Sequence, residues 1–517
     1  MVLATALPVS PVMATAPAGA ANDRVDDGLL LGGVGAGLPS DGVPSRPSRD
    51  VKSILRSQAD APATTGTLRP AAVPAFATAG YVQRAIPPGA HPYALAAPVP
   101  LTDSGVHDSQ GVRMIRIGTR LFNHPVGQAS YGLTNVASFD LTADHRYLDR
   151  AIAQADRLVA TKIVSRDGWY FPYPFDFALH GLPQETMRAP WYSGMAQGMA
   201  LSLFVELYRR TNDSDWLTGA AGTVASFRNG PSTGLPWVTH IDGQGYLWLE
   251  EYPREPASAS DFTLNGHLFA TFGLYDYATL SGDPWTTQLF DGAATTARHY
   301  GSAFAPDGFR IPSWLSAYCL RHGVLDVKYH GIVMNQLIAA HSLTADAVFA
   351  RLSDTFRTDY PETMTSTVRF TVGTWTGYVF DSQGRILRSR TVGIRGTSTA
   401  PADAYARIKG RGLYYRITAG SLKGYWIAER TERVHAVGQY GTARYYPDRH
   451  ARFRAGTTTG YRFDANGLRS SSRAITLSAA SSAPFDQTAM FGGRRYARIT
   501  AGGLAGYWVP TASVTLD

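Results

Sequence analysis

The strongest constraint on the fold is a polar turn that recurs along the middle of the chain. Each copy has an aspartate followed, two or three residues later, by an aromatic or aliphatic residue that opens a helical stretch. The copies recur 63 to 69 residues apart, about one long helical hairpin each, at Asp144 to Tyr147, Asp213 to Trp216, Asp283 to Trp285 and Asp346 to Val348. Aspartate is a favoured N-cap, so each copy predicts a helix start. Four hairpins in series suggest an incomplete α/α toroid whose inner helices converge on a cleft.

One helix of this series is expected over residues 194–209. Met195 and Met199 lie at helical spacing on one face, which predicts a core stripe. Gly194 and Gly198 lie one turn apart on an adjoining stripe. Because glycine has no side chain, we expect a neighbouring helix to approach closely there.

After residue 363 the pattern becomes β-like, with aromatic residues, threonine and valine between glycine-containing turns. The segment at 370–386 parallels 453–468, and 415–426 parallels 497–508. The sequence therefore predicts two tandem all-β modules. The expected domains are a signal-like segment with a Pro/Ala-rich linker (1–104), the helical domain (105–362), the first module (363–445) and the second module (446–517).

Composition narrows the classes of function. Charged residues make up 17% and the net charge is +8, with no basic stripe of the kind that nucleic-acid binding needs. The surplus would attract an anionic polymer, or it serves solubility alone. Cys319 is a single cysteine, so no internal disulfide can form. Residues 1–21 are apolar and end in small residues, which predicts export to the cell exterior or surface, and no apolar run is long enough for a membrane span.

Three short stretches place phenolic and polar groups in otherwise apolar surroundings. They are 248–253 (WLEEYP), 313–322 (SWLSAYCLRH) and 328–337 (KYHGIVMNQL). With the helix start at 190–198 (PWYSGMAQG) and the motifs LNG at 264–266 and GLYD at 273–276, they resemble the C-terminal domain of D-glucuronyl C5-epimerases, in the family's order and over about half the chain. Cys319 stands where that family usually has an acidic residue, Val333 replaces a second histidine, and the segment between His322 and Tyr329 is shorter than in the animal enzymes. These differences leave the identity of the substrate polysaccharide undecided.

The resemblance implies C5 epimerisation of hexuronate residues, glucuronate to iduronate, in a heparosan-type polysaccharide. The C5 hydrogen is α to a carboxylate, so a cation must hold that carboxylate, and Arg321 can do so in a bidentate fork. Inversion needs a base and a proton donor on opposite ring faces. We assign Glu251 with Tyr252 to one face and Tyr329 to the other, either of which could act first, and Tyr318 to a supporting hydrogen bond.

Six residues of the same motifs are expected to contact the sugar chain: Tyr192, Gln197, Asn265, His322, His330 and Asn335. No metal or other cofactor is expected, because Arg321 can act as the electrophile and the histidines lack neighbours at ligand spacing. Each of these tyrosines, arginines and histidines could equally be a packing or hydrogen-bonding residue.

Three alternatives to epimerisation stay open. A polysaccharide lyase shares the proton abstraction. A glycoside hydrolase would need a second carboxylate such as Asp276, because Glu250 and Glu251 are adjacent. A non-catalytic protein would bind a cell-wall or surface polymer through the β modules, whose Gly-Tyr-Trp turns lie near Arg411, Lys423, Arg494 and Arg495. The aromatic residues of these turns could instead form each module's core. A homodimer is a further expectation.

Overall fold

A computed structural model describes residues 75–517, which divide into two compact units. The N-terminal unit comprises residues 75–309 and 318–324, and the C-terminal unit comprises residues 310–317 and 325–517. The signal-like segment predicted at 1–21 lies outside the described residues. None of the helices in residues 75–517 has the length and hydropathy to cross a membrane.

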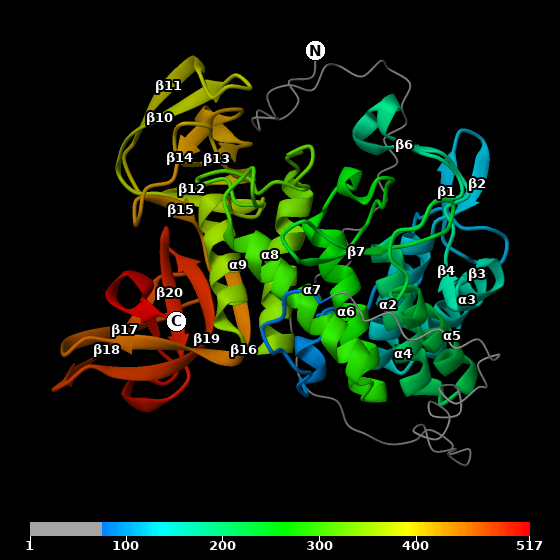
Figure 1. Cartoon of the computed structure of the whole chain (residues 1–517). Helices are drawn as coiled ribbons and strands as arrows, with labels where there is room; N and C mark the ends of the chain where they lie inside the picture. The colour runs from blue at the N-terminus through cyan, green and yellow to red at the C-terminus, as the bar shows by residue number, and fades with distance from the viewer. Residues whose placement is uncertain (1–74) are drawn as a thin grey trace. The chain divides into compact units, whose positions relative to one another are not determined.

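The described residues contain eight α-helices in four consecutive pairs, as the sequence predicts (Figure 1). The pairs are α2 (Pro125–Thr142) with α3 (His145–Thr161), α4 (Gly194–Thr211) with α5 (Ser214–Ser226), α6 (Leu264–Ser281) with α7 (Pro284–Ser302), and α8 (Val327–Thr344) with α9 (Ala347–Asp359). Within the N-terminal unit, α4 packs against both α2 and α6. The first helices of these pairs therefore lie side by side.

The same local chemistry turns the chain within each pair. The first helix ends in a left-handed residue, and the aspartate after it caps the second helix by accepting a hydrogen bond from a backbone amide; the capping residues are Asp144, Asp213, Asp283 and Asp346. The hydroxyl two residues before each aspartate accepts a hydrogen bond from the aspartate's own amide, at 3.1 to 3.3 Å. All four predicted N-caps are confirmed.

Glycine allows α4 and α6 to meet closely, as expected. A Cβ atom on Gly198 would lie 2.2 Å from Cα of Ala270, and one on Gly273 would lie 2.1 Å from the carbonyl oxygen of Gly198. Either contact is impossible without separating the helices. Met195 and Met199 are buried in the core, as predicted.

Short β-hairpins connect the helix pairs of the N-terminal unit. Each pairs two antiparallel strands: β1 (Met114–Ile117) with β2 (Arg120–Asn123), β3 (Ile163–Ser165) with β4 (Gly168–Tyr170), β5 (Phe177–Ala178) with β6 (Thr186–Met187), and β7 (Thr239–Ile241) with β8 (Leu247–Leu249). One hairpin precedes α2, two lie between α3 and α4, and one lies between α5 and α6. They therefore place loop residues at the start of α2, α4 and α6.

The prediction of a linker up to residue 104 is wrong for residues 75–104. Tyr93, Leu95 and Val99 are buried, and the carbonyl oxygen of Val99 accepts a hydrogen bond from Tyr147 of α3. The backbone amides of Ala79 and Gly80 donate to the Asp291 carboxylate of α7. Proline and alanine do not prevent a segment from packing when its few large apolar residues find a helical surface.

The C-terminal unit contains two seven-stranded sheets with one topology. The first has the order β11-β10-β14-β13-β12-β9-β15 and the second the order β18-β17-β21-β20-β19-β16-β22, so each strand occupies the same place as its counterpart. The first sheet's strands are β9 (Ser366–Phe370), β10 (Gly373–Phe380), β11 (Ile386–Ile394), β12 (Ser398–Arg407), β13 (Leu413–Ile417), β14 (Trp426–Ala428) and β15 (Val434–Ala436). The second sheet's strands are β16 (Tyr440–Phe453), β17 (Gly456–Phe463), β18 (Arg469–Leu477), β19 (Ser481–Phe491), β20 (Arg494–Ile499), β21 (Trp508–Pro510) and β22 (Thr515–Leu516). The second sheet therefore begins at residue 440, before the expected boundary at 446.

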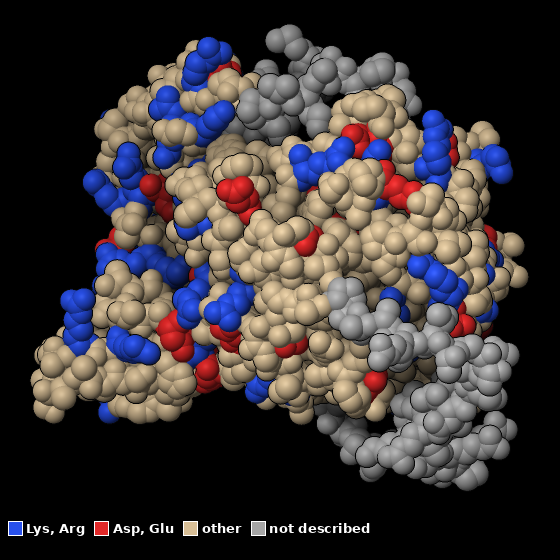
Figure 2. Space-filling model, viewed as in Figure 1, with Lys and Arg blue, Asp and Glu red and all other residues tan. Residues whose placement is uncertain are grey.

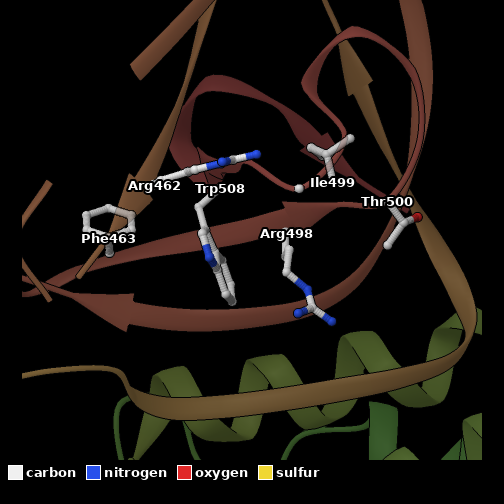
Figure 3. A pocket seen from close by; sticks show the side chains of 7 residues that line it. Arg462, Phe463, Arg498, Ile499, Thr500 and Trp508 are labelled. Atoms are coloured by element: carbon white, nitrogen blue, oxygen red, sulfur yellow. The ribbon is translucent and has the colours of Figure 1, made fainter. Parts of the chain in front are cut away.

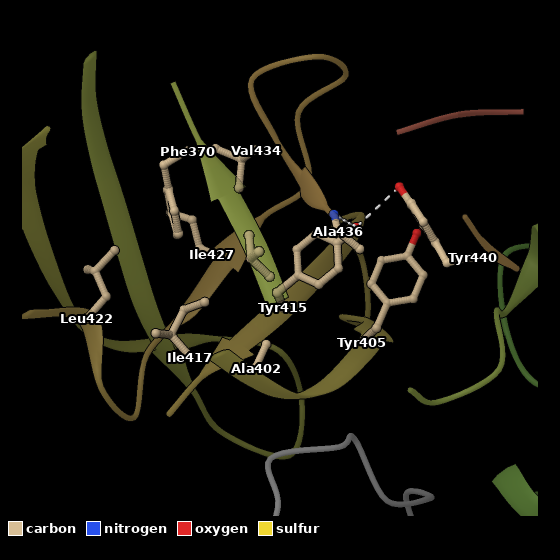
Figure 4. Close-up of a cluster of buried hydrophobic side chains, with 11 residues drawn as sticks. Phe370, Ala402, Tyr405, Tyr415, Ile417, Leu422, Ile427, Val434, Ala436 and Tyr440 are labelled. Carbon is tan, nitrogen blue, oxygen red and sulfur yellow. Dashed lines mark hydrogen bonds between the residues drawn. The ribbon is translucent and has the colours of Figure 1, made fainter. Parts of the chain in front are cut away.

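Three tyrosine hydroxyls lie within the hydrophobic core of the first sheet, whose side chains Figure 4 shows. The hydroxyls of Tyr405, Tyr415 and Tyr440 all donate to the carboxylate of Glu429, at 3.0, 2.6 and 2.9 Å. Tyr415 also accepts a hydrogen bond from the backbone amide of Ala436 at 3.1 Å. These bonds satisfy polar atoms that would otherwise be costly to bury.

The expected domain boundary at residue 362 differs from the division of the structure. Helices α8 and α9 belong to the C-terminal unit, where Ala350 of α9 lies in the core of the second sheet. Leu315 and Tyr360 lie in a core with Phe380 and Trp426 of the first sheet. The fourth helical pair and the sheets therefore share cores, so removal of the sheets would expose apolar helical surface.

Loss of the buried Arg449 side chain should destabilise the C-terminal unit. Arg449, from β16, is 2% exposed and pairs with Asp354 of α9 at 2.7 Å and with Asp517 at 3.3 Å. Arg449→Met removes the buried partner of both carboxylates, and we expect a loss of about 3 kcal/mol in the free energy of unfolding, measured by thermal or denaturant unfolding. Arg188→Ala is the control, because Arg188 and its partner Asp176 are exposed, and it should cost less than about 1 kcal/mol. Equal losses in the two variants would contradict this role for Arg449.

Candidate active site

Glu251 is a buried carboxylate beside the start of α6. It follows β8 by two residues and is 6% exposed. Its Oε2 atom accepts hydrogen bonds from the Thr263 hydroxyl at 2.7 Å and the Tyr318 hydroxyl at 3.2 Å. A Cβ atom on Gly266 would lie 2.5 Å from Oε2 of Glu251, so this glycine of α6 makes room for the carboxylate. Burial raises the pKa of Glu251 to about 7, which suits a group that must both take and return a proton near neutral pH.

Glu250 faces a different set of neighbours from Glu251. One of its carboxylate oxygens accepts a hydrogen bond from the backbone amide of Phe262 at 3.3 Å, and the other lies 3.5 Å from Nδ1 of His240. Burial raises the pKa of Glu250 well above its ordinary value. The two adjacent glutamates therefore do not act on one bond from two sides.

Tyr252 and Tyr318 extend the hydrogen bonding of Glu251. Their hydroxyl oxygens lie 3.4 Å apart, and Tyr318 donates to the carboxylate, so the two phenols and Glu251 form a continuous chain. The ring of Tyr252 is stacked with Phe177 and tilted against Trp191, each at a centroid distance of 6.0 Å. Aromatic faces of this kind are common beside sugar-binding sites, and they fix the orientation of Tyr252.

Arg321 lies on the same turn as Tyr318, three residues further along the chain. This limits the distance between their Cα atoms to about 11 Å, and Tyr318 contacts Glu251, so Arg321 and Glu251 belong to the same part of the N-terminal unit. Arg321 is exposed, and its guanidinium meets Glu185 at 3.4 Å. Glu185 also pairs with Arg254. Because Arg321 is exposed and its contact with Glu185 is long, the pair contributes little free energy, and a substrate carboxylate can replace Glu185 as the partner of Arg321.

Three of the predicted sugar contacts have clear places in the N-terminal unit. Tyr192 is half-buried, with its ring against Tyr170 at a centroid distance of 5.5 Å. Asn265 is the second residue of α6 and 1% exposed. Gln197 is completely buried and binds the backbone of residues 169 and 171 and the Ser226 hydroxyl. Gln197 therefore holds β4 against α4 and does not face a substrate.

The predicted residues of α8 belong to the C-terminal unit, so their place relative to Glu251 stays a prediction. Tyr329 is in the first turn of α8, where its amide donates to Asp326, and its place on the second ring face stays a prediction. His330 is 2% exposed, accepts from the Ser316 amide at Nδ1 and donates from Nε2 to the Tyr360 carbonyl oxygen. His330 is thus structural and not a sugar contact. The amide of Asn335 lies on the same helix and bonds to the carbonyl oxygen of Gly331.

Sequence reasoning missed three residues beside the site. Thr263 binds Glu251 directly, and Glu185 meets Arg321. Asp261 is completely buried. Its carboxylate oxygens contact a ring nitrogen of His180 at 2.9 Å and a ring nitrogen of His322 at 2.6 Å. Thr263 immediately precedes the LNG motif and could have been found there. Asp261 and Glu185 carry no signal in the sequence, because their partners lie tens of residues away.

Part of the chain is similar to known proteins. Residues 166–358 match the family model described as "D-glucuronyl C5-epimerase C-terminus". This region of the chain is therefore similar to the C-terminal part of D-glucuronyl C5-epimerases. The D-glucuronyl C5-epimerase of Caenorhabditis elegans is 35% identical over 130 residues, which are 25% of this chain and 19% of that protein. The match thus spans about a fifth of the relative's length.

Solved structures of carbohydrate-active enzymes show more distant similarity. Cellobiose 2-epimerase from Bacillus thermoamylovorans has a TM-score of 0.35 and 15% identity, over 49% of this chain and 65% of that chain. Unsaturated glucuronyl hydrolase from a Bacillus species has a TM-score of 0.30 and 17% identity, over 45% of this chain and 62% of that chain.

Proposed function

We propose that the chain epimerises hexuronate residues at C5, glucuronate to iduronate, within an anionic polysaccharide of the heparosan type. The observation that carries the proposal is the buried Glu251 carboxylate, whose pKa is raised to about 7 and which accepts a hydrogen bond from the Tyr318 hydroxyl, in a segment that matches the C5-epimerase family model. We also propose that the helical pairs form an incomplete α/α toroid. We further propose that residues 1–21 direct export from the cell.

The reaction follows from the chemistry of a uronate. Removal of the C5 proton places negative charge on a group that already bears a carboxylate, and Arg321 offsets that charge through a bidentate pair. Glu251 takes the proton from one ring face, and its hydrogen bonds from Thr263 and Tyr318 stabilise the ionised form beforehand. Return of a proton from the opposite face inverts C5, and we assign that face to Tyr329.

The geometry argues against a hydrolase built on Glu251 and Asp276. Gly266 lies against Glu251, and Asp276 follows ten residues later on α6, which is about 15 Å along the helix axis. Inverting glycosidases separate their carboxyl groups by about 6.5–9.5 Å, and retaining ones by less. Asp276 is also fully buried and bonded to Ser202 at 2.6 Å and His91 at 2.8 Å.

Product analysis separates epimerisation from the remaining enzymatic alternatives. An epimerase should introduce solvent deuterium at C5 of heparosan without chain cleavage. A lyase would instead produce an unsaturated uronate that absorbs ultraviolet light, and a hydrolase would produce new reducing ends. Either of those products at the rate of exchange would refute the proposal.

A second role, retention on an anionic polymer, is favoured by the charge of the C-terminal sheets. Residues 363–517 contain 22 Lys and Arg against 8 Asp and Glu, a net charge of +14 in a chain whose total is +8. Figure 2 shows many of these basic side chains at the surface. Exposed arginines include Arg388 and Arg390 of β11 and Arg469 and Arg473 of β18. We therefore propose that the sheets hold the protein on cell-wall or substrate polymer.

A surface groove of the second sheet is a candidate contact for that polymer (Figure 3). It has a volume of about 470 Å³ and is lined by Arg462, Phe463, Arg498, Ile499, Thr500, Gly506 and Trp508. Arg498 is paired with Asp486, whereas Arg462 is exposed and lies 4.7 Å from the centroid of the Tyr507 ring. The first sheet has the same residue types at the equivalent positions, except for Val379 in place of Arg462. Trp426 and Trp508 of the Gly-Tyr-Trp turns are buried, so these two tryptophans belong to the cores of the modules.

Arg462→Ala should weaken retention on immobilised heparosan several-fold and leave turnover of short oligosaccharides unchanged. Arg473→Ala is the matched control, because it removes the same charge from an exposed position outside the groove. Equal weakening by both substitutions would show that net charge alone retains the protein and would refute the groove as a contact. Truncation at residue 363 would not test this role, because α8 and α9 share cores with the sheets and would lose their packing. A homodimer stays a prediction.

A further inference from the structure

Three loops of the N-terminal unit bring two histidines, an aspartate and the sole cysteine of the sequence to one point. His180 lies in the short helix Leu179–Gly181, Asp261 lies three residues before α6, and Cys319 and His322 lie in the turn that carries Tyr318. Nε2 of His180 is 3.6 Å from Sγ of Cys319, in addition to its contact with Asp261. One nitrogen, sulfur or oxygen atom from each of the four residues lies within 4.8 Å of the other three.

The donor types and their spacing fit a zinc ion. Zn²⁺ binds nitrogen and oxygen at about 2.0–2.2 Å and sulfur at about 2.3 Å, so a tetrahedral ion places its ligand atoms about 3.3–3.8 Å apart. The His180–Cys319 separation of 3.6 Å lies within that range, and the two histidine–Asp261 hydrogen bonds of 2.6 and 2.9 Å would lengthen by less than about 1 Å to admit an ion. A thiol with two imidazoles excludes calcium and magnesium, which prefer ligand sets made of oxygen.

The cluster is also enclosed. Asp261 and Cys319 are completely buried, and the side chains of His180 and His322 are 7% and 17% exposed. The two oxygens of the Asp261 carboxylate each bond to one of the histidines, His180 at Oδ2 and His322 at Oδ1. A buried carboxylate between two imidazoles and a thiol offers a full set of four ligands with little room for water.

We propose that His180, Asp261, Cys319 and His322 bind one Zn²⁺ as a closed structural site. On binding, the Cys319 thiol gives its proton to solvent, the two imidazoles bind in the neutral form, and no redox change occurs. Four protein ligands leave no open position for substrate, so the ion takes no part in proton transfer. It ties the turn with Tyr318 and Arg321 to the loop before α6 and thereby positions both residues. This differs from the sequence-based expectation that no metal is bound and that His322 contacts sugar.

Cobalt substitution of the full chain tests the ligand set. Metal-depleted protein titrated with Co²⁺ should develop, at one equivalent, the strong visible bands of tetrahedral cobalt and a thiolate-to-cobalt charge-transfer band, which can come from Cys319 alone. Cys319→Ser should lose the charge-transfer band, and His180→Ala should weaken binding more than tenfold. His91→Ala is the control, because His91 belongs to a separate cluster with Glu206 and Asp276, and its spectrum should match that of the wild type.

A measurement without substitutions keeps the proposal falsifiable if a variant fails to fold. X-ray absorption at the zinc edge of the zinc-loaded wild type should show one sulfur at about 2.3 Å and three nitrogen or oxygen neighbours at about 2.0 Å. Zinc should also raise the melting temperature of the wild type. Failure to bind one equivalent, or a bound ion without sulfur, would overturn the proposal and leave the cluster as a hydrogen-bonded network around Asp261.

Discussion

Glu251→Gln should reduce the rate of proton exchange at C5 by about 10²–10⁴-fold, which is the usual contribution of a general base. The amide keeps the size of the side chain and can still accept a hydrogen bond from Thr263 or Tyr318, but it cannot take a proton. The fold should be retained. Mass spectrometry of uronate oligosaccharides incubated in D₂O measures the exchange, and thermal unfolding checks the fold.

Glu250→Gln is the matched control for this substitution. Glu250 is also buried, but its carboxylate bonds to the backbone amide of Phe262 and lies beside His240 instead of Tyr318, so exchange in this variant should remain near that of the wild type. The pH profile gives a second check on Glu251. As a base with a pKa of about 7, Glu251 must lose its proton before it can act, so exchange should rise as the pH increases through 7 and then level off. Equal losses in the two glutamine variants, or a flat profile, would contradict the assignment.

Arg321→Ala should reduce exchange by about 10²–10³-fold, because the charge that develops next to the substrate carboxylate loses its partner. Arg321→Lys should restore part of the activity, since a lysine keeps the positive charge but not the bidentate geometry. Exchange kinetics at saturating and at low substrate concentration measure both effects. Because the side chain is exposed, neither substitution should change the melting temperature.

Arg254→Ala provides the control for Arg321. Arg254 pairs with the same Glu185, so its loss changes the local charge by the same amount without removing the proposed substrate contact. We expect at most a few-fold change in exchange. A loss as large as that of Arg321→Ala would show that the positive charge around Glu185 matters and that Arg321 has no individual role.

The helical pairs could be predicted because their signals are local. An aspartate N-cap needs only the amides of the next few residues, so the spacing of Asp144, Asp213, Asp283 and Asp346 located four helix starts. The left-handed residue before each of these aspartates is alanine, asparagine or glycine, and because of this variety the sequence did not reveal the left-handed position. The hydroxyl two residues before the aspartate is the signal that would have shown it.

The candidate site was predictable only in part. Glu251, Tyr252 and Tyr318 lie in motifs that the family resemblance identified, and they contact one another. The same motifs contain Gln197 and His330, which are buried and satisfied by neighbouring backbone. A motif does not separate a residue that builds a site from one that faces it, because that distinction depends on the direction of the side chain.

Contacts between residues far apart in the sequence could not be predicted. The apolar face of α9 predicts burial but does not say what covers it, and Ala350 proves to be covered by the second sheet. In the same way, His180 and Asp261 are 81 residues apart, and no local pattern connects them. Tertiary contacts of this length are visible only once the loops are placed.

Solvent exchange at C5 of heparosan tests the proposed function most directly. Wild-type protein incubated with heparosan in D₂O should place deuterium at C5 of the uronate residues, and NMR should show iduronate appearing in a chain of unchanged length. The exchange should depend on Glu251 and Arg321. Absence of deuterium at C5 of heparosan and of other polyuronates, with a folded protein across pH 6–9, would contradict uronate epimerisation.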